Sequence, residues 1–388
     1  MDSAECVTLV PFVHQVGGHT GMMKYDEVTV CKPVSPAELR FYETLTPELA
    51  QFTPGFKGVV HVSVQEEDDG SLSVRAYPIR VQHQTLAGPR CPSNGELWAP
   101  DPAGEEDTER SPKSDEQKMS QTSLPEESDP LDNKDSSSEE DLFEDHSESK
   151  TTRQQFERGN PWGVHLNRLQ MARMHKDFGS SKLHKFILLE NLTSKFRSPC
   201  ILDIKLGTKT YHKDHSEAKR QLHIDRDAAT TTATLGLRLC GMQVYQPSKG
   251  CYKCRNKYDG RRLGKDGLRR ALCEYFSTCD QVRMELLPPF IEKLQGLIRV
   301  VSAITTFSFL STSLLFMYEG DTGDQSGVGA SEVSRDLLVD LRIIDFANSE
   351  SDPDHITDIE SSNKGCLYGL KNLLQILESI QGTVNDSS

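Results

Sequence analysis

The feature that most constrains the fold is a long stretch without hydrophobic periodicity. From Gln84 to about Arg153 the chain is filled with Ser, Pro, Asp and Glu. Such a stretch cannot bury enough apolar surface to offset the entropy lost on ordering. We therefore predict a disordered acidic linker at 91–155, and a folded protein that is assembled from the residues on both sides of it.

Most of the charge of the chain lies in this stretch. The formal net charge is −14 at pH 7, yet Asp101 to Lys150 alone contains 18 Asp or Glu and five Lys or Arg. The rest of the chain is therefore almost neutral and can present local basic patches to an anionic small molecule. The acidic linker is a candidate surface for protein partners, and we expect no nucleic-acid partner.

Outside the linker, the hydrophobic pattern alternates between strand and helix periods. Ser35 and Glu38 form a capping pattern around Pro36, which predicts a helix over 35–45. Other helices are expected at 166–176, 212–226, 266–276, 280–303 and 366–380. Strands are expected at 6–16, 27–32, 58–64, 71–81, 185–190, 199–205, 234–246, 252–258, 307–318 and 340–346. This mixture predicts an α+β fold.

The composition argues against a membrane protein and against an oxidising compartment. The apolar run 297–318 is interrupted by Arg299 and seven Ser or Thr residues, so it indicates core elements and no membrane span. The ten cysteines are scattered, and the chain starts without a basic segment followed by an apolar one. We expect a cytoplasmic and nuclear protein with reduced thiols.

The densest chemical signal is the segment Pro199-Cys-Ile-Leu-Asp203-Ile-Lys205-Leu-Gly207. Residues two apart share one face of a strand, so Asp203 and Lys205 are expected side by side. A carboxylate and an ammonium group in this arrangement suit a site that holds a hydroxyl and a phosphate together. A structural ion pair is the alternative, and the residues alone leave both open.

This segment matches the Pro-x-x-x-Asp-x-Lys-x-Gly signature of the inositol polyphosphate kinases. Downstream, Ser311-Thr-Ser313-Leu-Leu and Ile344-Asp345-Phe-Ala resemble two further motifs of that family, in the family's order. The chain most resembles the inositol hexakisphosphate kinase branch, through Pro11-Phe-Val-His-Gln-Val-Gly-Gly-His19, Thr29-Val-Cys-Lys32-Pro, Asn160-Pro-Trp-Gly and Cys240-Gly-Met-Gln-Val-Tyr. The resemblance covers nearly all of the chain except the acidic linker.

The resemblance implies a two-lobed, kinase-like fold. Residues 1–90 and 156–190 would form a small β-rich N-terminal lobe that ends in a hinge. Residues 191–385 would form a larger α+β catalytic lobe that carries the inositol phosphate site. The linker at 91–155 would be an insert in the N-terminal lobe.

The same resemblance implies which residues bind ATP. Lys32 would grip the phosphates and pair with Glu38, as the strand lysine and helix glutamate do in protein kinases; an ordinary lysine at a strand end is the alternative. The backbone at Glu190 and Leu192 would bind adenine, and Asp203 would bind the ribose hydroxyls.

Catalysis and metal binding are implied for three residues. Lys205 would face the transferred phosphate, and Asp345 resembles the metal-binding aspartate of protein kinases, so Mg²⁺ is implied as a cofactor beside ATP. Ser313 would assist near the metal, unless it is a buried strand serine bonded to the backbone.

A cationic stripe follows the signature. If 212–226 is helical, His212, His215, Lys219, His223 and Arg226 are spaced 3, 4, 4 and 3 residues apart and fall on one face. Lys205 and Lys209 lie just upstream, and Lys213 and Arg220 flank the stripe. Such a row can follow the phosphates around an inositol ring, whereas a solvated helix face is the alternative.

The chain lacks the His-Arg-Asp motif that gives protein kinases a base for an alcohol acceptor. A phosphate acceptor needs no strong base, because its second pKa is about 6. We therefore expect an enzyme that converts inositol hexakisphosphate to diphosphoinositol pentakisphosphate with ATP. A kinase for less phosphorylated inositols, or a weakened member of the family that serves as a scaffold, is the alternative.

Overall fold

The structure is a computed structural model, and it describes residues 6–67, 72–78, 159–176, 183–278, 281–321, 338–349 and 359–385. The predicted linker at 91–155 lies outside these residues, so its disorder and its role as a surface for protein partners stay predictions. The described residues combine strands and helices and confirm the predicted α+β class.

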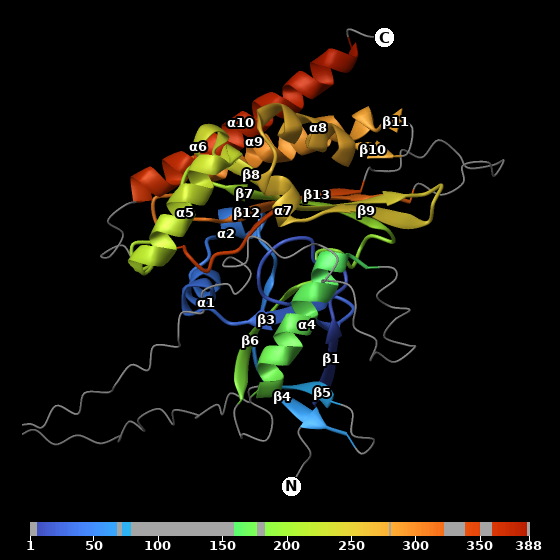
Figure 1. Cartoon of the computed structure of the whole chain (residues 1–388), viewed down its shortest axis with the longest axis vertical. Helices are drawn as coiled ribbons and strands as arrows, with labels where there is room; N and C mark the ends of the chain where they lie inside the picture. The colour runs from blue at the N-terminus through green and yellow to red at the C-terminus, as the bar shows by residue number, and fades with distance from the viewer. Residues whose placement is uncertain are drawn as a thin grey trace, which may run out of the picture. The chain divides into compact units, whose positions relative to one another are not determined.

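Strands from both sides of the linker close into one barrel (Figure 1). Neighbouring strands are antiparallel and follow the order β1-β2-β3-β6-β4-β5. The bounds are β1 Val7–Pro11, β2 Met23–Asp26, β3 Thr29–Pro33, β4 Phe56–Glu66, β5 Leu72–Pro78 and β6 His184–Glu190. Apolar side chains such as Met23, Val62 and Phe186 fill the barrel core. Strand β6 therefore completes a barrel whose preceding strand, β5, ends about a hundred residues earlier in the chain.

Three helices lie between the barrel strands in the sequence. They are α1 Pro36–Glu43 and α2 Pro47–Ala50, between β3 and β4, and α4 Pro161–Lys176, between β5 and β6. The helix predicted at 35–45 is confirmed, but its predicted capping box is wrong. Ser35 makes no side-chain capping bond, and Glu38 turns inward to pair with Lys32. Helix α4 starts earlier than expected because the side chain of Asn160 accepts a hydrogen bond from the amide of Trp162, at 2.9 Å.

The second half of the fold is a five-stranded antiparallel sheet in the order β13-β12-β7-β8-β9. Its strands are β7 Pro199–Leu206, β8 Leu237–Gln246, β9 Cys251–Arg255, β12 Ser313–Glu319 and β13 Val339–Ile344. The signature strand β7 is central, and its register places Asp203 opposite both Leu315 and Gly241. A bulge between Asp203 and Ile204 interrupts the pairing with β8, as is common beside active sites.

Helices pack on one face of this sheet (Figure 1). They are α6 Thr231–Leu235, α8 Lys265–Tyr275, α9 Leu287–Ala303 and α10 Ile359–Asn385, with α5 Glu217–Ala229 and α7 Lys257–Arg261 at its edge. The short pair β10 Ser277–Thr278 and β11 Gln281–Val282 and the 3-10 turn η2 Met284–Leu286 precede α9. Buried residues of α9 and β12, such as Leu297 and Phe316, belong to the large core cluster. The apolar run 297–318 therefore contributes to the core, as predicted. Among the described helices, none combines the length and the apolar composition that crossing a bilayer requires.

Candidate active site

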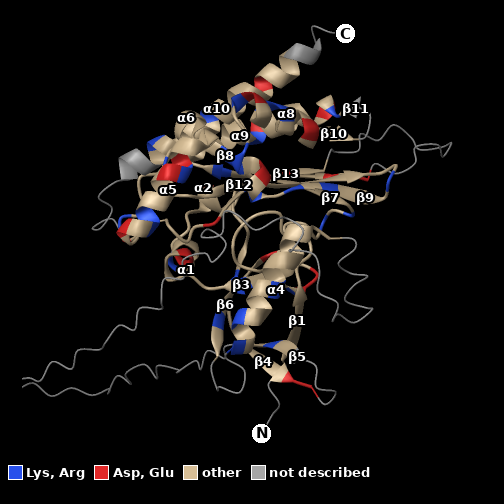
Figure 2. Ribbon diagram, viewed as in Figure 1, with Lys and Arg blue, Asp and Glu red and all other residues tan. Residues whose placement is uncertain are grey.

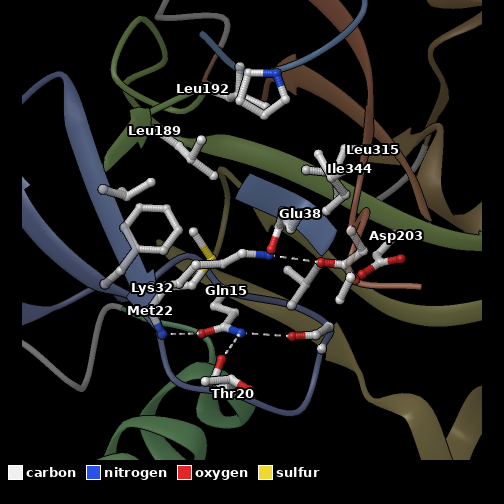
Figure 3. A pocket seen from close by; sticks show the side chains of 18 of the residues that line it. Gln15, Thr20, Met22, Lys32, Glu38, Leu189, Leu192, Asp203, Leu315 and Ile344 are labelled. Atoms are coloured by element: carbon white, nitrogen blue, oxygen red, sulfur yellow. Dashed lines mark hydrogen bonds and ion pairs between the residues drawn. The ribbon is translucent and has the colours of Figure 1, made fainter. Parts of the chain in front are cut away.

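A cavity of about 310 Å³ lies where the barrel, the β1–β2 loop and the signature strand meet. Seven residues that the sequence analysis predicted for the site line this cavity: Lys32, Glu38, Glu190, Leu192, Asp203, Lys205 and Asp345. Apolar side chains, among them Leu189, Leu192, Leu315 and Ile344, line one part, and the charged groups Lys32, Glu38 and Asp203 lie together in another (Figure 3). The cavity therefore suits a ligand with a flat apolar part and an anionic part.

Lys32, from β3, is the centre of the charged group. Its ammonium lies 2.8 Å from Oε1 of Glu38 and 3.4 Å from Oδ1 of Asp345. Burial alone would lower the pKa of Lys32, but the two carboxylates raise it above its ordinary value. Burial would likewise raise the pKa of Asp345, but the charges of Lys32 and Lys205 lower it. Lys32 is therefore cationic and Asp345 anionic at neutral pH, and the predicted Lys32–Glu38 pair is present.

Asp345 has a backbone φ of 64°, in the left-handed region that few non-glycine residues adopt. The next residue holds this conformation in place. Phe346 is fully buried, and its ring stacks on Phe41 of α1 with centroids 3.6 Å apart. Its amide also donates a hydrogen bond to Glu38. Helix α1 therefore fixes both the lysine and the carboxylate of the site.

Asp203 lies on β7 and is 3% exposed. Its Oδ1 has no hydrogen-bond partner in the protein. Burial and the nearby charge of Asp345 raise the pKa of Asp203 to about 7. Among the residues that the structure describes, no direct ion pair joins Asp203 to Lys205, although the charge of Lys205 opposes the rise in the pKa of Asp203.

Lys205 instead reaches across to the segment before β12. Its ammonium donates to the backbone oxygen of Ser311 at 2.8 Å and to its hydroxyl at 3.3 Å. Ser311, like Asp345, has a positive φ, here 56°. Ser313 pairs with Lys205 in the sheet, and its fully buried side chain lies beside Asp203, but it is not part of the cavity lining. Its predicted role near a metal stays a prediction.

The oxygen atoms of this site fit a divalent cation. Asp345 is 29% exposed toward the cavity, and Asp203 offers a buried oxygen without a partner. Mg²⁺ binds hard oxygen ligands, commonly one or two carboxylates together with substrate phosphates. A cation near these two carboxylates would also relieve the repulsion that raises the pKa of Asp203.

The predicted hinge follows β6. The amide of Glu190 donates to the backbone oxygen of Gly55 at 2.8 Å, and the Glu190 carboxylate accepts from the Gly55 amide at 3.1 Å. The amide of Asn191 is also used, by the backbone oxygen of Val28. The prediction named the backbone at both Glu190 and Leu192. Because the amide of Glu190 is already bonded, the amide of Leu192 is the candidate donor for adenine of these two.

The cationic stripe is built differently from the prediction. The helix expected at 212–226 is wrong at its start: α5 begins at Glu217, because the hydroxyl of Ser216 accepts from the amide of Lys219 and caps the helix. His212 and His215 lie in the preceding turn, where the amide of His212 donates to Nδ1 of His215. Only Lys219, His223 and Arg226 share a helix face.

The histidines nevertheless converge. The ring of His215 lies 6.2 Å from that of His212 and 5.2 Å from that of His223. Lys219 and Arg226 are half-buried, whereas Lys213 and Arg220 are exposed and Lys209 precedes the turn. Figure 2 shows acidic residues on α5 as well, so the helical part of the stripe, Lys219, His223 and Arg226, lies on a helix of mixed charge. None of these residues lines the cavity.

A buried network that the sequence did not reveal ties α5 to the signature strand. Asp227 of α5 accepts from the amide and the hydroxyl of Thr210, four residues after β7 ends. Arg238 of β8 lies 3.7 Å from the same carboxylate, and the hydroxyl of Thr210 also meets Nδ1 of His223 at 2.9 Å. The stripe is thus held in a fixed position relative to the strand that carries Lys205.

The β1–β2 loop, which also lines the cavity, is organised by Gln15. Its amide nitrogen donates to the backbone oxygens of Gly17 and Thr20, and its oxygen accepts from the amide of Met22 (Figure 3). The loop lies so close to the sheet that a Cβ on Gly17 would come within 2.0 Å of the Asp203 carboxylate. The sequence marked this loop as glycine-containing, but it did not indicate that Gln15 shapes it.

Comparison with known proteins gives a consistent result. Residues 186–378 match the family model described as inositol polyphosphate kinase. Human inositol hexakisphosphate kinase 3 is 34% identical and mouse inositol hexakisphosphate kinase 1 is 35% identical, each alignment covering 97% of this chain and 96% or 94% of the relative. A solved structure of inositol phosphate multikinase from S. cerevisiae, in complex with ADP and Mn²⁺, is 28% identical over 51% of this chain and 84% of its own, with a TM-score of 0.43.

Proposed function

The chain belongs to the inositol polyphosphate kinase family, and we propose that it transfers the γ-phosphate of ATP to inositol hexakisphosphate, giving a diphosphoinositol pentakisphosphate. The observation that carries this proposal is the convergence of Lys32, Asp203, Lys205 and Asp345 on one cavity. The choice of acceptor is supported by the relatives, which are inositol hexakisphosphate kinases by name. We propose the cytoplasm and nucleus as the location.

The two parts of the cavity correspond to the two parts of ATP. Leu189, Leu192 and Leu315 would form apolar walls for adenine, and the charged group would receive the phosphates. Lys32 is held by Glu38 and Asp345, so its ammonium is already in place when ATP binds. Because little covalent help is needed in phosphoryl transfer, this positioning is the main contribution of the protein.

Asp345 would hold Mg²⁺ in this site, and Asp203 beside it would bind the ribose hydroxyls of ATP. A bound magnesium ion neutralises the charge of the phosphates during transfer. Lys205 lies on the same strand as Asp203 and would stabilise the charge on the transferred phosphoryl group. The strand then leads directly to Lys209 and the cationic stripe, where the inositol phosphate would lie.

The stripe makes a prediction about substrate binding. Replacing Lys219 with Ala should raise the KM for inositol hexakisphosphate about tenfold, because one charge-assisted contact is lost, and leave the KM for ATP nearly unchanged. Raising the ionic strength should weaken binding of the inositol phosphate in the same way, because ions screen contacts in a partly open groove. Steady-state kinetics with each substrate varied in turn provide the measurement.

Lys265, an exposed lysine at the start of α8, gives the matched control. Lys265→Ala removes the same charge away from the stripe and should change neither KM. Equal effects of Lys219→Ala on both substrates, or no effect on either, would reduce the stripe to an ordinary solvated face.

A further inference from the structure

A buried cluster of three polar side chains joins the β1–β2 loop to the sheet. The side-chain amide of Gln243, on β8, donates to Nδ1 of His14 at 3.2 Å and to the backbone oxygen of Pro199 at 2.8 Å. Its oxygen accepts from the side-chain amide of Asn160 at 3.3 Å. The three side chains come from the loop, the start of α4 and the middle of β8, so their contacts span up to 229 residues of sequence.

Two of the three side chains are buried, and the His14 ring is half-buried. Gln243 is fully buried, and Asn160 is 1% exposed. Both hydrogens of the Gln243 amide and its oxygen are used, which fixes the orientation of the amide. Burial lowers the pKa of His14 to about 4, so its ring is neutral at pH 7 and can accept at Nδ1. A buried network in which every member is bonded holds its parts in one arrangement.

The groups held by Gln243 belong to the nucleotide cavity. His14 lines that cavity, as do the six loop residues that follow it. Pro199 is the first residue of the strand that carries Asp203 and Lys205. Asn160 makes a second contact with the loop, because its backbone amide donates a hydrogen bond to the backbone oxygen of Val13 at 2.8 Å.

The packing next to the cluster shows how close the loop lies to the sheet. A Cβ on Gly241, two residues before Gln243, would come within 1.8 Å of the backbone oxygen of Val16. The loop backbone therefore rests directly on β8. Gln243 bonds His14 of the loop and Pro199 of β7 through the same side-chain amide. The loop therefore cannot shift along the sheet without breaking one of these hydrogen bonds.

We propose that Gln243 is a positioning residue for nucleotide binding: through His14 and Asn160 it fixes the β1–β2 loop against the signature strand, so that the ATP cavity is formed before ATP arrives. This inference rests on the proposed function, since it takes the cavity to be the ATP site. Preorganisation strengthens binding because the ligand does not have to order the loop itself.

The test replaces Gln243 with Met, which keeps the length of the side chain and removes its hydrogen bonds. His14, Pro199 and Asn160 then each lose a partner, so the affinity for Mg-ATP should fall about 10- to 100-fold. Isothermal titration calorimetry with Mg-ATP, in the absence of any inositol phosphate, measures this. The KM for inositol hexakisphosphate should change less than threefold, because the cluster contacts no residue of the cationic stripe.

Gln246 is the matched control. It is also a buried glutamine of β8, but its side-chain amide donates to the backbone oxygens of Val244 and Tyr245 on its own strand. Gln246→Met removes a buried glutamine amide from the same strand and should leave the affinity for Mg-ATP within threefold of the wild-type value, with the Tm of both variants measured alongside. If loss of stability were the cause, both variants would lose affinity for Mg-ATP. If Gln243 is a positioning residue, only Gln243→Met loses it.

Two variants of His14 test whether Gln243 acts through its hydrogen bond to His14, and they leave the sheet residues unchanged. Asn carries an oxygen at about the place of Nδ1, so His14→Asn should retain most of the affinity for Mg-ATP, whereas His14→Leu should lose it about tenfold. Combined with Gln243→Met, His14→Leu should add little, because the two residues act through one contact. Tight Mg-ATP binding by Gln243→Met and His14→Leu would overturn the inference and leave the proposed function standing. Failure of the wild-type protein to bind Mg-ATP would overturn both.

Discussion

Asp345→Asn should abolish phosphoryl transfer and leave the folded protein nearly unchanged. The carboxylate is more accessible than those of Glu38 and Asp203 in the same cavity, and its loss removes the proposed metal ligand. Asn suits the fold at this position, because it tolerates the left-handed backbone that Asp345 adopts. Lys32 keeps its shorter ion pair with Glu38, so no buried charge is left without a partner.

We expect kcat/KM to fall by about a thousandfold or more, which corresponds to about 4 kcal/mol of transition-state stabilisation. The Tm should stay within about 2 °C of that of the wild-type protein. The measurement is turnover of ATP with inositol hexakisphosphate, alongside thermal unfolding. Asp266→Asn, on the exposed first turn of α8, removes the same charge elsewhere and should leave turnover unchanged. Turnover by Asp345→Asn within tenfold of wild type would remove the assignment.

Lys205→Met should have the second largest effect. Met keeps most of the buried stem but removes the ammonium, and loss of a single electrostatic contact to the transition state costs about 2–4 kcal/mol, or roughly 30- to 1000-fold in kcat/KM. The loss should appear mainly in kcat, because the contact is proposed to strengthen as the phosphoryl group moves.

The structure also offers a purely structural role for Lys205. A second variant distinguishes this role from a role in catalysis. The ammonium bonds to Ser311, whose positive φ is a strained conformation for Ser but not for Gly. If Lys205 only holds this segment, adding Ser311→Gly to Lys205→Met should restore activity. We expect the double variant to be as inactive as Lys205→Met alone, and recovery would contradict a role in catalysis.

The sequence predicted the charged half of the site because each residue lies in a short motif. Asp203 and Lys205 are two apart on a strand of apolar residues, and Asp345 follows the strand β13. Local spacing decides which face such residues share, and the structure places all three on the same cavity. The α+β class was predictable for the same reason, since strand and helix periods are local properties.

Where two local interpretations compete, the sequence does not choose between them. Ser35 and Glu38 form a capping pattern, but a buried ion pair with Lys32 takes Glu38 away from the helix end. The spacing of His212 and His215 continues the helical stripe, yet Ser216 is the residue that caps α5, so both histidines fall in a turn. In both cases a contact made by one side chain overrides a regular spacing.

Contacts across the fold were not predictable from the pattern. Phe41 and Phe346 stack although they are about three hundred residues apart, and Gln243 meets His14 across 229 residues. A buried glutamine in a strand gives no signal of its partner, because its sequence neighbours are not its neighbours in space. The same holds for Asp227, which anchors the cationic stripe to Thr210.

The most direct test of the central claim is incubation of the pure protein with Mg-ATP and a panel of inositol phosphates, with products separated by charge. We predict that inositol hexakisphosphate gives a product with one additional phosphate, and that one ADP is released for each product molecule. Asp345→Asn should give neither. Transfer only to less phosphorylated inositols, or binding of ATP without transfer to any member of the panel, would contradict the proposed function.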